Sequence, residues 1–264
     1  YDQALAIYAE LISETPSDRR RLDEYGMTLN AKGRALQILR RFEEAQALYQ
    51  QAREVRARLV EMHADDPEFT RQLANTVMNL GTIAIQQGQQ DQGLELWQQA
   101  QALPLAQLAE GVELATLLRD YGKGSFNLGH LFWSRNEVDA ARGHLGDAIQ
   151  AFEKLVKQSP DMLESQLNLA LAYRRMGELA PAEPTEEPAA RADLANYQRA
   201  IELLARLALR NPQDPKYSEE LAGARITYAE VLISTGQHTP ALAALEKSLE
   251  TLRGLSEQVP DEPY

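Results

Sequence analysis

This sequence contains glycines around a lysine, residue types that can bind phosphate, but their spacing does not fit a phosphate-binding loop. Residues 121–126, YGKGSF, place two glycines around a lysine, as a phosphate-binding loop does. They lack the Gly-x-x-x-x-Gly-Lys-Ser/Thr spacing with which backbone N–H groups surround a phosphate, and they precede an expected helix instead of following a strand. We therefore expect no nucleotide site there.

Metal and thiol chemistry are also not expected. The chain has no cysteine, which removes disulfides, thiol catalysis and the usual structural zinc frameworks. No two histidines stand four residues apart, the spacing that places two imidazoles on one helix face. Adjacent carboxylates such as Glu43 and Glu44 face different ways on a helix. We expect no enzyme activity in this chain, no metal ion and no cofactor. The four histidines are His63, His130, His144 and His238.

Net charge and hydropathy limit the classes of partner that the chain can have. The net charge is −12, and the 27 Lys and Arg residues are scattered, whereas a nucleic-acid binder needs a basic surface. No stretch of apolar residues is long enough to span a membrane, and the N-terminal residues do not have the pattern of a signal peptide. We expect no nucleic-acid partner, no membrane insertion and a cytoplasmic location.

The composition favours helices. Ala, Leu, Gln and Glu abound, while aromatic residues make up 6% of the chain. Straight-chain residues and alanine lose little freedom in a helix, whereas sheets are rich in aromatic and β-branched residues. We expect an all-α chain.

A short phrase recurs along the chain and indicates internal repeats. Its first three copies are equally spaced, and a fixed period of this kind decides the architecture. The copies are RRFEEA at 40–45, GQQDQG at 88–93, NEVDAA at 136–141 and GQHTPA at 236–241.

Apolar residues with helical spacing lie on both sides of the phrase. We name the helix expected before it the A helix and the helix expected after it the B helix. Steps of three and four residues place each set on one helix face. The A set of one unit is Phe69, Leu73, Val77, Leu80 and Ala84, and the B set of another is Ala45, Leu48, Tyr49, Ala52, Val55, Leu59 and Met62. Two helices of about 20 residues with short turns account for the period.

Small residues mark the place where the two helices of a unit should approach each other. Gly81, Gly129 and Ala170 each follow a leucine in three successive A helices. Prolines that cannot continue a helix stand after two B helices, at Pro160 and Pro260.

These residues resemble the tetratricopeptide repeat (TPR) family. Leu128, Gly129, Phe132, Ala141 and Pro160 stand at the family's spacing, although no Trp opens the A helix and the units exceed the usual length. The long units with NLG or NLA resemble the repeats of kinesin light chains and of arrays attached to bacterial serine/threonine kinases. The resemblance implies a right-handed superhelical α-solenoid of antiparallel helix pairs, in a protein of bacterial type.

The expected organisation is one solenoid domain over residues 1–264. We expect an acidic, proline-rich loop at 181–191, after which the B helix resumes near Asp193. Because Tyr1 falls in the middle of a repeat, we expect the chain to be a fragment of a longer protein. The expected units are a half-repeat with a B helix at 1–18 and repeats at 19–66, 67–112, 113–161, 162–213 and 214–264.

In TPR proteins the A helices line a concave groove that binds extended peptides, and the resemblance implies the same use here. Asn79, Asn127 and Asn168 each precede a leucine and a small residue, which predicts a ladder of amides along the groove. An Asn amide can pair with both the N–H and the C=O of a peptide backbone. The alternative is that each Asn bonds within its own repeat or to water.

Further residues should line the same groove. The predicted partner-binding set adds Arg34, Thr82, Gln86, His130, Trp133, Arg174 and Arg175. Its basic members favour an acidic or C-terminal-carboxylate ligand. Arg34, Asn79 and Lys123 match only part of the carboxylate clamp of co-chaperone members of the family. Trp133 is either an aromatic anchor in the groove or part of the core, because it stands beside core-facing Phe132.

We therefore expect a protein–protein interaction scaffold that binds an extended peptide or partner protein. Two alternatives stay open. One is a self-association module that joins copies as a homo-oligomer through exposed repeat ends. The other is the regulatory or targeting region of a larger enzyme, such as a serine/threonine kinase.

Overall fold

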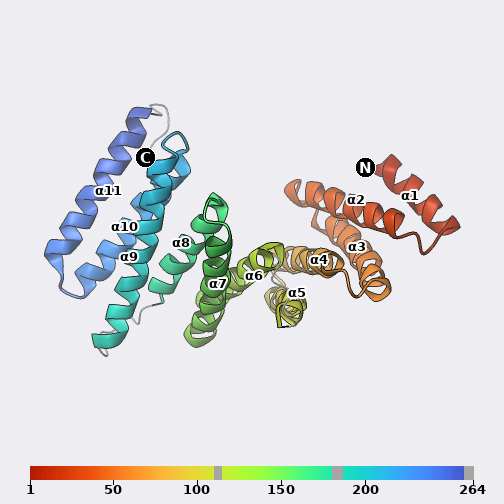
Figure 1. Ribbon diagram of the computed structural model, residues 1–264, viewed down its shortest axis with the longest axis horizontal. Coiled ribbons are helices and arrows are strands. Elements are labelled where there is room, and N and C mark those ends of the chain that lie inside the picture. Colours follow the sequence, from red (N-terminus) through yellow and green to blue (C-terminus); the bar gives the residue numbers. More distant parts are fainter. Residues whose placement is uncertain (110–114, 180–186, 259–264) are drawn as a thin grey trace. The chain divides into compact units, whose positions relative to one another are not determined.

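The computed structural model of the chain describes residues 1–109, 115–179 and 187–258 (Figure 1). In these ranges the chain forms helices joined by short turns, and none of these residues is in a strand. The prediction of an all-α repeat fold is confirmed.

The helices alternate as A and B along the chain after a leading helix, α1 (Asp2–Glu14), that packs against α2. The A helices are α2 (Arg19–Ile38), α4 (Pro67–Gln86), α6 (Ala115–Ser134), α8 (Leu163–Gly177) and α10 (Pro215–Ser234). The B helices are α3 (Phe42–Met62), α5 (Gln90–Ala109), α7 (Val138–Gln158), α9 (Glu187–Arg210) and α11 (His238–Gln258).

The starts of the A helices fix the register of the repeats. The helices α2, α4, α6 and α8 begin at equal intervals, whereas α10 begins slightly later than the same interval would place it, so the fourth repeat carries a short insertion. Asp18, Asp66 and Asp214 cap the N-termini of α2, α4 and α10 by accepting hydrogen bonds from backbone N–H groups. Residues at equal distance from these starts can therefore be compared directly.

The repeated phrase begins with the residue that ends each A helix. Arg40, Gly88, Asn136 and Gly236 have φ between 59° and 83°, in the left-handed region. The next residue then donates its N–H to a carbonyl five positions back, for example Gln89 to Ala84 at 2.8 Å. This is the Schellman turn, which favours glycine or asparagine at its left-handed position. The phrase recurs because α2, α4, α6 and α10 end in the same turn.

A glycine stands where the two helices of a unit meet. Gly33, Gly81, Gly129 and Gly177 are equally spaced along the chain, and a Cβ on them would lie 2.8, 2.4, 2.7 and 2.7 Å from the nearest side chain. Those side chains are Tyr49, Trp97, Leu145 and Tyr197 of the paired B helices. The fourth member of this series is therefore Gly177, and the prediction of Ala170 was wrong, because Ala170 stands two turns earlier in its helix.

The predicted apolar faces are largely buried. Phe69, Val77, Leu80 and Ala84 are buried on α4, and Tyr49 is buried on α3. Ala45, Ala52 and Leu59 are also buried on α3. Four predicted residues of these faces need correction. Met62 is 37% exposed at the end of α3, and Leu48, Val55 and Leu73 are only half-buried.

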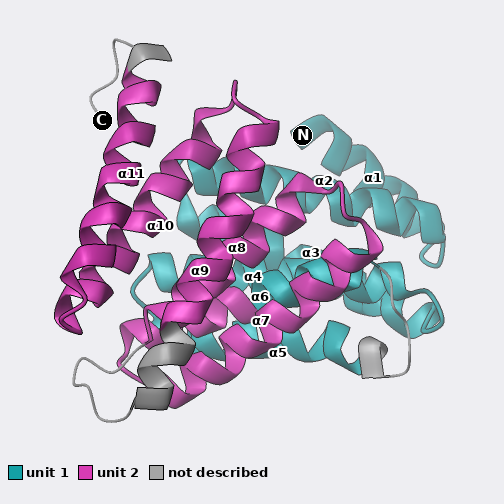
Figure 2. Cartoon of the chain, turned by 60° about the vertical axis from the view of Figure 1, so that its left-hand side comes forward, with its two compact units in different colours: residues 1–124 teal, residues 125–264 magenta. Residues whose placement is uncertain are grey.

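The described helices form two compact units, residues 1–124 and residues 125–264 (Figure 2). Unit 1 holds α1 to α5 and the first half of α6, and unit 2 holds the rest. Each unit is considered by itself below, and the single solenoid domain stays a prediction.

The expected acidic loop is shorter than predicted. Helix α9 begins at Glu187, not near Asp193, so Pro188 is the second residue of the helix. A proline fits there because the N–H groups of the first helical turn have no partner within the helix. The rest of the predicted loop, residues 180–186, lies outside the described residues.

Candidate partner-binding surfaces

In unit 1, amide side chains join two neighbouring A helices. Asn79 of α4 donates from Nδ2 to Oδ1 of Asn30 on α2 at 3.4 Å, and Asn30 donates to the hydroxyl of Thr76 on α4 at 2.9 Å. Asn79 thus bonds to the preceding repeat and not within its own. Its Oδ1 accepts no hydrogen bond from another described residue. We call Asn30, Thr76 and Asn79 the amide relay.

The other predicted residues of unit 1 lie on α2 and α4 but are differently engaged. Thr82 donates its hydroxyl to the carbonyl of Met78 at 3.0 Å in its own helix. Gln86 is exposed and accepts from Gln37 of α2 at 3.1 Å. Arg34 is exposed and pairs with no acid in the described part of the chain. Only Arg34 therefore offers an uncompensated charge.

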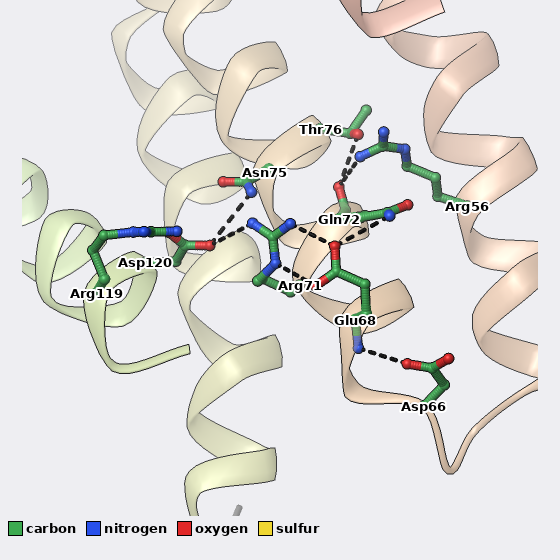
Figure 3. Close-up of polar contacts among 9 residues, drawn as sticks. All are labelled: Arg56, Asp66, Glu68, Arg71, Gln72, Asn75, Thr76, Arg119 and Asp120. Carbon is green, nitrogen blue, oxygen red and sulfur yellow. Dashed lines mark hydrogen bonds and ion pairs between the residues drawn. The ribbon is translucent and has the colours of Figure 1, made fainter. Parts of the chain in front are cut away.

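A second polar network lies one to two turns nearer the start of α4 (Figure 3). Arg71 contacts both carboxylate oxygens of Glu68, at 2.5 and 2.8 Å, and reaches Asp120 of α6 at 3.1 Å. Asn75 and Arg119 also approach Asp120, each at 3.4 Å. The side chain of Asp120 is only 15% exposed, and a carboxylate that has lost most of its water needs compensating donors, which these three side chains provide. The hydrogen bonds to Glu68 and the nearby charge of Arg71 lower the pKa of Glu68.

Arg56 of α3 lies beneath this network and is buried. Its Nη1 donates to the carbonyl of Gln72 at 2.6 Å, while its Nε has no partner among the described residues. Burial lowers the pKa of Arg56 to about 10. This network links α3, α4 and α6 of unit 1 and offers little free polar surface.

In unit 2, the predicted aromatic and basic residues form one cluster. The guanidinium of Arg175 on α8 lies 4.5 Å from the centre of the Trp133 ring of α6. His130 of α6 stacks on the same indole, with ring centres 5.6 Å apart and planes at 29°. Trp133 is half-buried while Phe132 beside it is buried, so Trp133 lies at the surface. We call His130, Trp133 and Arg175 the aromatic cluster.

The basic residues of unit 2 are paired with acids. Arg174 lies 2.8 Å from a carboxylate oxygen of Glu220 on α10 and 3.6 Å from Glu178. Arg175 also bonds to Glu178. The loss of water around the ring and then the charge of Arg175 lower the pKa of His130. The basic face that the sequence suggested is thus largely neutral.

The three predicted Asn residues do not occupy one register. Asn79 and Asn127 are both the thirteenth residue of their helices, but Asn168 is the sixth residue of α8. Seven residues place it about 10 Å nearer the start of the helix. Arg175 holds the place in α8 that the two other Asn residues hold. Asn127 is half-buried and hydrogen-bonds to no described residue, and Nδ2 of Asn168 is buried without a partner among them.

Sequence reasoning missed the acids of these networks. Asp120 bonds to Arg71 and Asn75, which were not in the predicted set, while Glu178 and Glu220 balance the predicted Arg174 and Arg175. Their signal was available, because Asp120 and Glu220 share one register position, the sixth of the A helix. Finding this signal required the correct register of every A helix, and aligning residues 168–170, NLA, with the NLG of the earlier repeats had displaced the register of α8.

Two further chemistries find no basis in the described part of the chain. No group of three or more His, Asp or Glu side chains there is placed to hold a metal ion. None of its helices is both long and apolar enough to cross a membrane.

Comparison with known families decides the type of repeat. The family model of the tetratricopeptide repeat matches residues 26–68, from within α2 to the start of α4. Residues 26–68 are a tetratricopeptide repeat. The narrower likeness to kinesin light chains and to kinase-associated arrays stays a prediction.

Solved structures share the TPR fold of this chain. BtubC (BKLC) from P. vanneervenii is 16% identical with a TM-score of 0.71, over 100% of this chain and 92% of that chain. The yeast histone chaperone Hif1 is 14% identical with a TM-score of 0.56, over 81% of this chain and 98% of that chain. At these identities the likeness shows the fold alone. A comparison with curated proteins found no match.

Proposed function

We propose that this TPR protein is a protein-interaction scaffold whose A helices bind an extended segment of a partner protein. The repeat type supports this, because stacked helix-pair repeats create extended binding surfaces. Hif1, which shares the fold, is described as a scaffold protein recruiting protein complexes to core histones. A cytoplasmic location is part of the proposal.

The aromatic cluster of unit 2 is the observation that carries the proposal. Trp and Arg are the residue types that most often dominate binding energy, because they combine large contact area with hydrogen bonding. Here Trp133 remains half-exposed, and Arg175 and His130 hold its ring in place. An indole fixed in this way loses little conformational entropy when a ligand packs against its edge.

The amide relay of unit 1 is a separate candidate contact surface, considered within that unit. Asn79 donates one side-chain N–H to Asn30, which leaves its Oδ1 and its other N–H for a ligand. A backbone N–H and C=O of an extended peptide match this pair. Contact with the peptide backbone would bind many sequences, while the aromatic cluster would select side chains.

A preference for acidic ligands has to overcome the acids already present. A ligand carboxylate that binds Arg175 must displace Glu178, so two charge-assisted hydrogen-bond partners compete for one guanidinium. We therefore propose that a side chain packed on Trp133 contributes more than charge does. The change Glu178→Gln separates these terms, because it should strengthen binding only of ligands with a carboxylate at this place.

The experiment selects binders from a displayed library of random peptides and measures their affinity for single variants. Trp133→Ala and Arg175→Ala should each weaken the selected peptides about 30-fold, the effect of losing about 2 kcal/mol at a dominant contact. Arg206→Ala, which removes an exposed arginine of α9, is the matched control and should change nothing. Circular dichroism of each variant checks the fold.

Two results would contradict the proposal. In the first, selection enriches no peptide for the intact chain while it succeeds for an established peptide-binding protein. Alternatively, the enriched peptides would bind both variants as tightly as the unchanged protein does.

A further inference from the structure

Helix α11 carries a row of exposed leucines on one face. Leu242, Leu245 and Leu249 are 59%, 37% and 49% exposed, and half-buried Leu252 extends the row. Their steps of three, four and three residues keep all four on one side of the helix. The adjoining side, about a quarter turn around the helix, packs on α10 through Ala241, Ala244 and Ser248, whose hydroxyl donates to the carbonyl of Ala222. The leucine row therefore flanks the face that holds α11 in the unit.

Helix α9 has the same row, and there another helix covers it. The residues of α9 that stand one repeat earlier are Leu194, Tyr197, Ile201 and Leu204. Tyr197 is 1% exposed and Leu204 is 0% exposed, although Leu245 and Leu252 hold the same positions on α11. Tyr197 packs against Gly177 of α8 in its own repeat, and α10 covers the row of α9 from the other side, whereas α11 has no such second helix in the described part of unit 2 (Figure 1).

The contact of α10 with α9 shows what kind of surface fits this row. Tyr228 of α10 packs against Tyr197, with ring centres 5.9 Å apart, and Leu194 packs against the cluster that contains Ala229 and Leu232. At the edge, Gln198 donates to the hydroxyl of Tyr228 at 3.1 Å. The covering helix thus presents apolar side chains one turn apart and a polar group beside them.

The edge of the α11 row differs from that of α9 by its charge. Glu246 stands at the position of Gln198, whereas exposed Glu250, one turn later, has exposed Glu202 as its counterpart on α9, so the two edges differ by one carboxylate. A carboxylate only accepts hydrogen bonds, so a helix that covers α11 should place a hydroxyl or a basic donor there. Charge complementarity therefore favours a covering helix with a basic or hydroxyl-bearing edge.

We propose that the leucine row of α11 is a docking surface for an amphipathic helix of a partner protein. That helix packs on α11 as α10 packs on α9, with apolar residues on the leucines and a donor facing Glu246. The α9–α10 interface continues across this face, since the positions and the residue type of the row are repeated. This surface is distinct from the A-helix surfaces of the proposed function.

The probe for this surface is a labelled synthetic peptide with the sequence of residues 215–234, the helix that covers α9. It should bind the full chain saturably and gain helical content in circular dichroism when bound. Leu242→Glu and Leu249→Glu should each weaken binding about tenfold or more, because a charge then meets the apolar face of the peptide. Leu209→Glu, at an 83% exposed leucine of α9, is the control and should leave binding unchanged.

Two further measurements fix the outcome. Trp133→Ala should bind the probe normally, so failure of the proposed function and failure of this one are distinguishable. Glu246→Gln should weaken the probe less than the leucine changes do. Absence of saturable binding, or equal binding by the leucine variants, overturns the proposal. Sedimentation that shows a dimer of the full chain, which Leu249→Glu converts to a monomer, overturns it too, since the occupant is then a second copy.

Discussion

A single methyl group at Gly81 should destabilise unit 1. A Cβ there would lie 2.4 Å from Cδ1 and 2.8 Å from Nε1 of Trp97, and 3.0 Å from the carbonyl oxygen of Gly93. The ring of Trp97 is held by a hydrogen bond from its Nε1 to the carbonyl of Met78 at 3.1 Å. The indole therefore cannot retreat without losing this bond, and the backbone of the B helix limits movement on the other side.

The expected size of the effect follows from three terms. Overpacking a well-filled contact costs about 1–3 kcal/mol, and loss of the indole hydrogen bond costs about 1 kcal/mol. Alanine in place of glycine gains back about 1 kcal/mol of helix propensity. The change Gly81→Ala should thus lower the free energy of unfolding by about 2 kcal/mol, and Tm by about 4–8 °C.

The control is Gly143→Ala in the interior of α7, where a Cβ would meet no atom within 4 Å. It should stabilise the chain by about 0.5–1 kcal/mol, since propensity acts alone. Urea unfolding followed by circular dichroism measures both variants. Trp97 and Trp133 are the only two tryptophans, so a Trp133→Phe background lets fluorescence report unit 1 alone. If Gly81→Ala matches or exceeds the unchanged protein while Gly143→Ala gains stability, the close approach of α4 and α5 does not limit the packing.

Two further predictions test the electrostatics. Arg56→Met should leave the urea midpoint unchanged or raise stability by about 1–3 kcal/mol, because a buried cation with an unpaired Nε is replaced by an apolar chain of similar length. The lowered pKa of Arg56 means that the cost of burying its charge applies below about pH 10 and is relieved as pH rises through that value. A clear loss of stability in the variant would show that the guanidinium is needed. In an NMR titration the pKa of His130 should lie below its ordinary value and rise towards it in Arg175→Ala, because a nearby positive charge is removed; an unchanged pKa would mean that the cation over Trp133 does not reach the imidazole.

The period was readable from the sequence because the first three A helices end in the same left-handed turn. Arg40, Gly88 and Asn136 mark that turn at equal intervals. The register within α8 was misread for a physical reason. Two positions of each A helix need a small residue. Ala170 fills the earlier one, as Ala74 does in α4, but because a leucine precedes it, it was aligned with the later position that Gly81 fills.

The pairing between successive A helices could not be read, because it depends on which rotamers meet across repeats. Arg71 and Asp120 are 49 residues apart, and Arg174 and Glu220 are 46 apart. Neither spacing equals the period, since side chains lean along the helix to reach each other. Sequence spacing alone therefore gave the cations of the surface without the acids that neutralise them.

This compensation bears on how the chain would choose a partner. Because most of the predicted arginines are paired, the acidic excess of the chain, a net charge of −12, leaves a negative field that repels acidic ligands and attracts basic ones. For an uncharged ligand segment this field contributes little to association. Selectivity then depends on short-range contact: the half-exposed indole of Trp133, the open amide oxygen of Asn79 and the leucines of α11. Binding at such places should vary weakly with ionic strength, and its variants should change the rate of dissociation more than the rate of association.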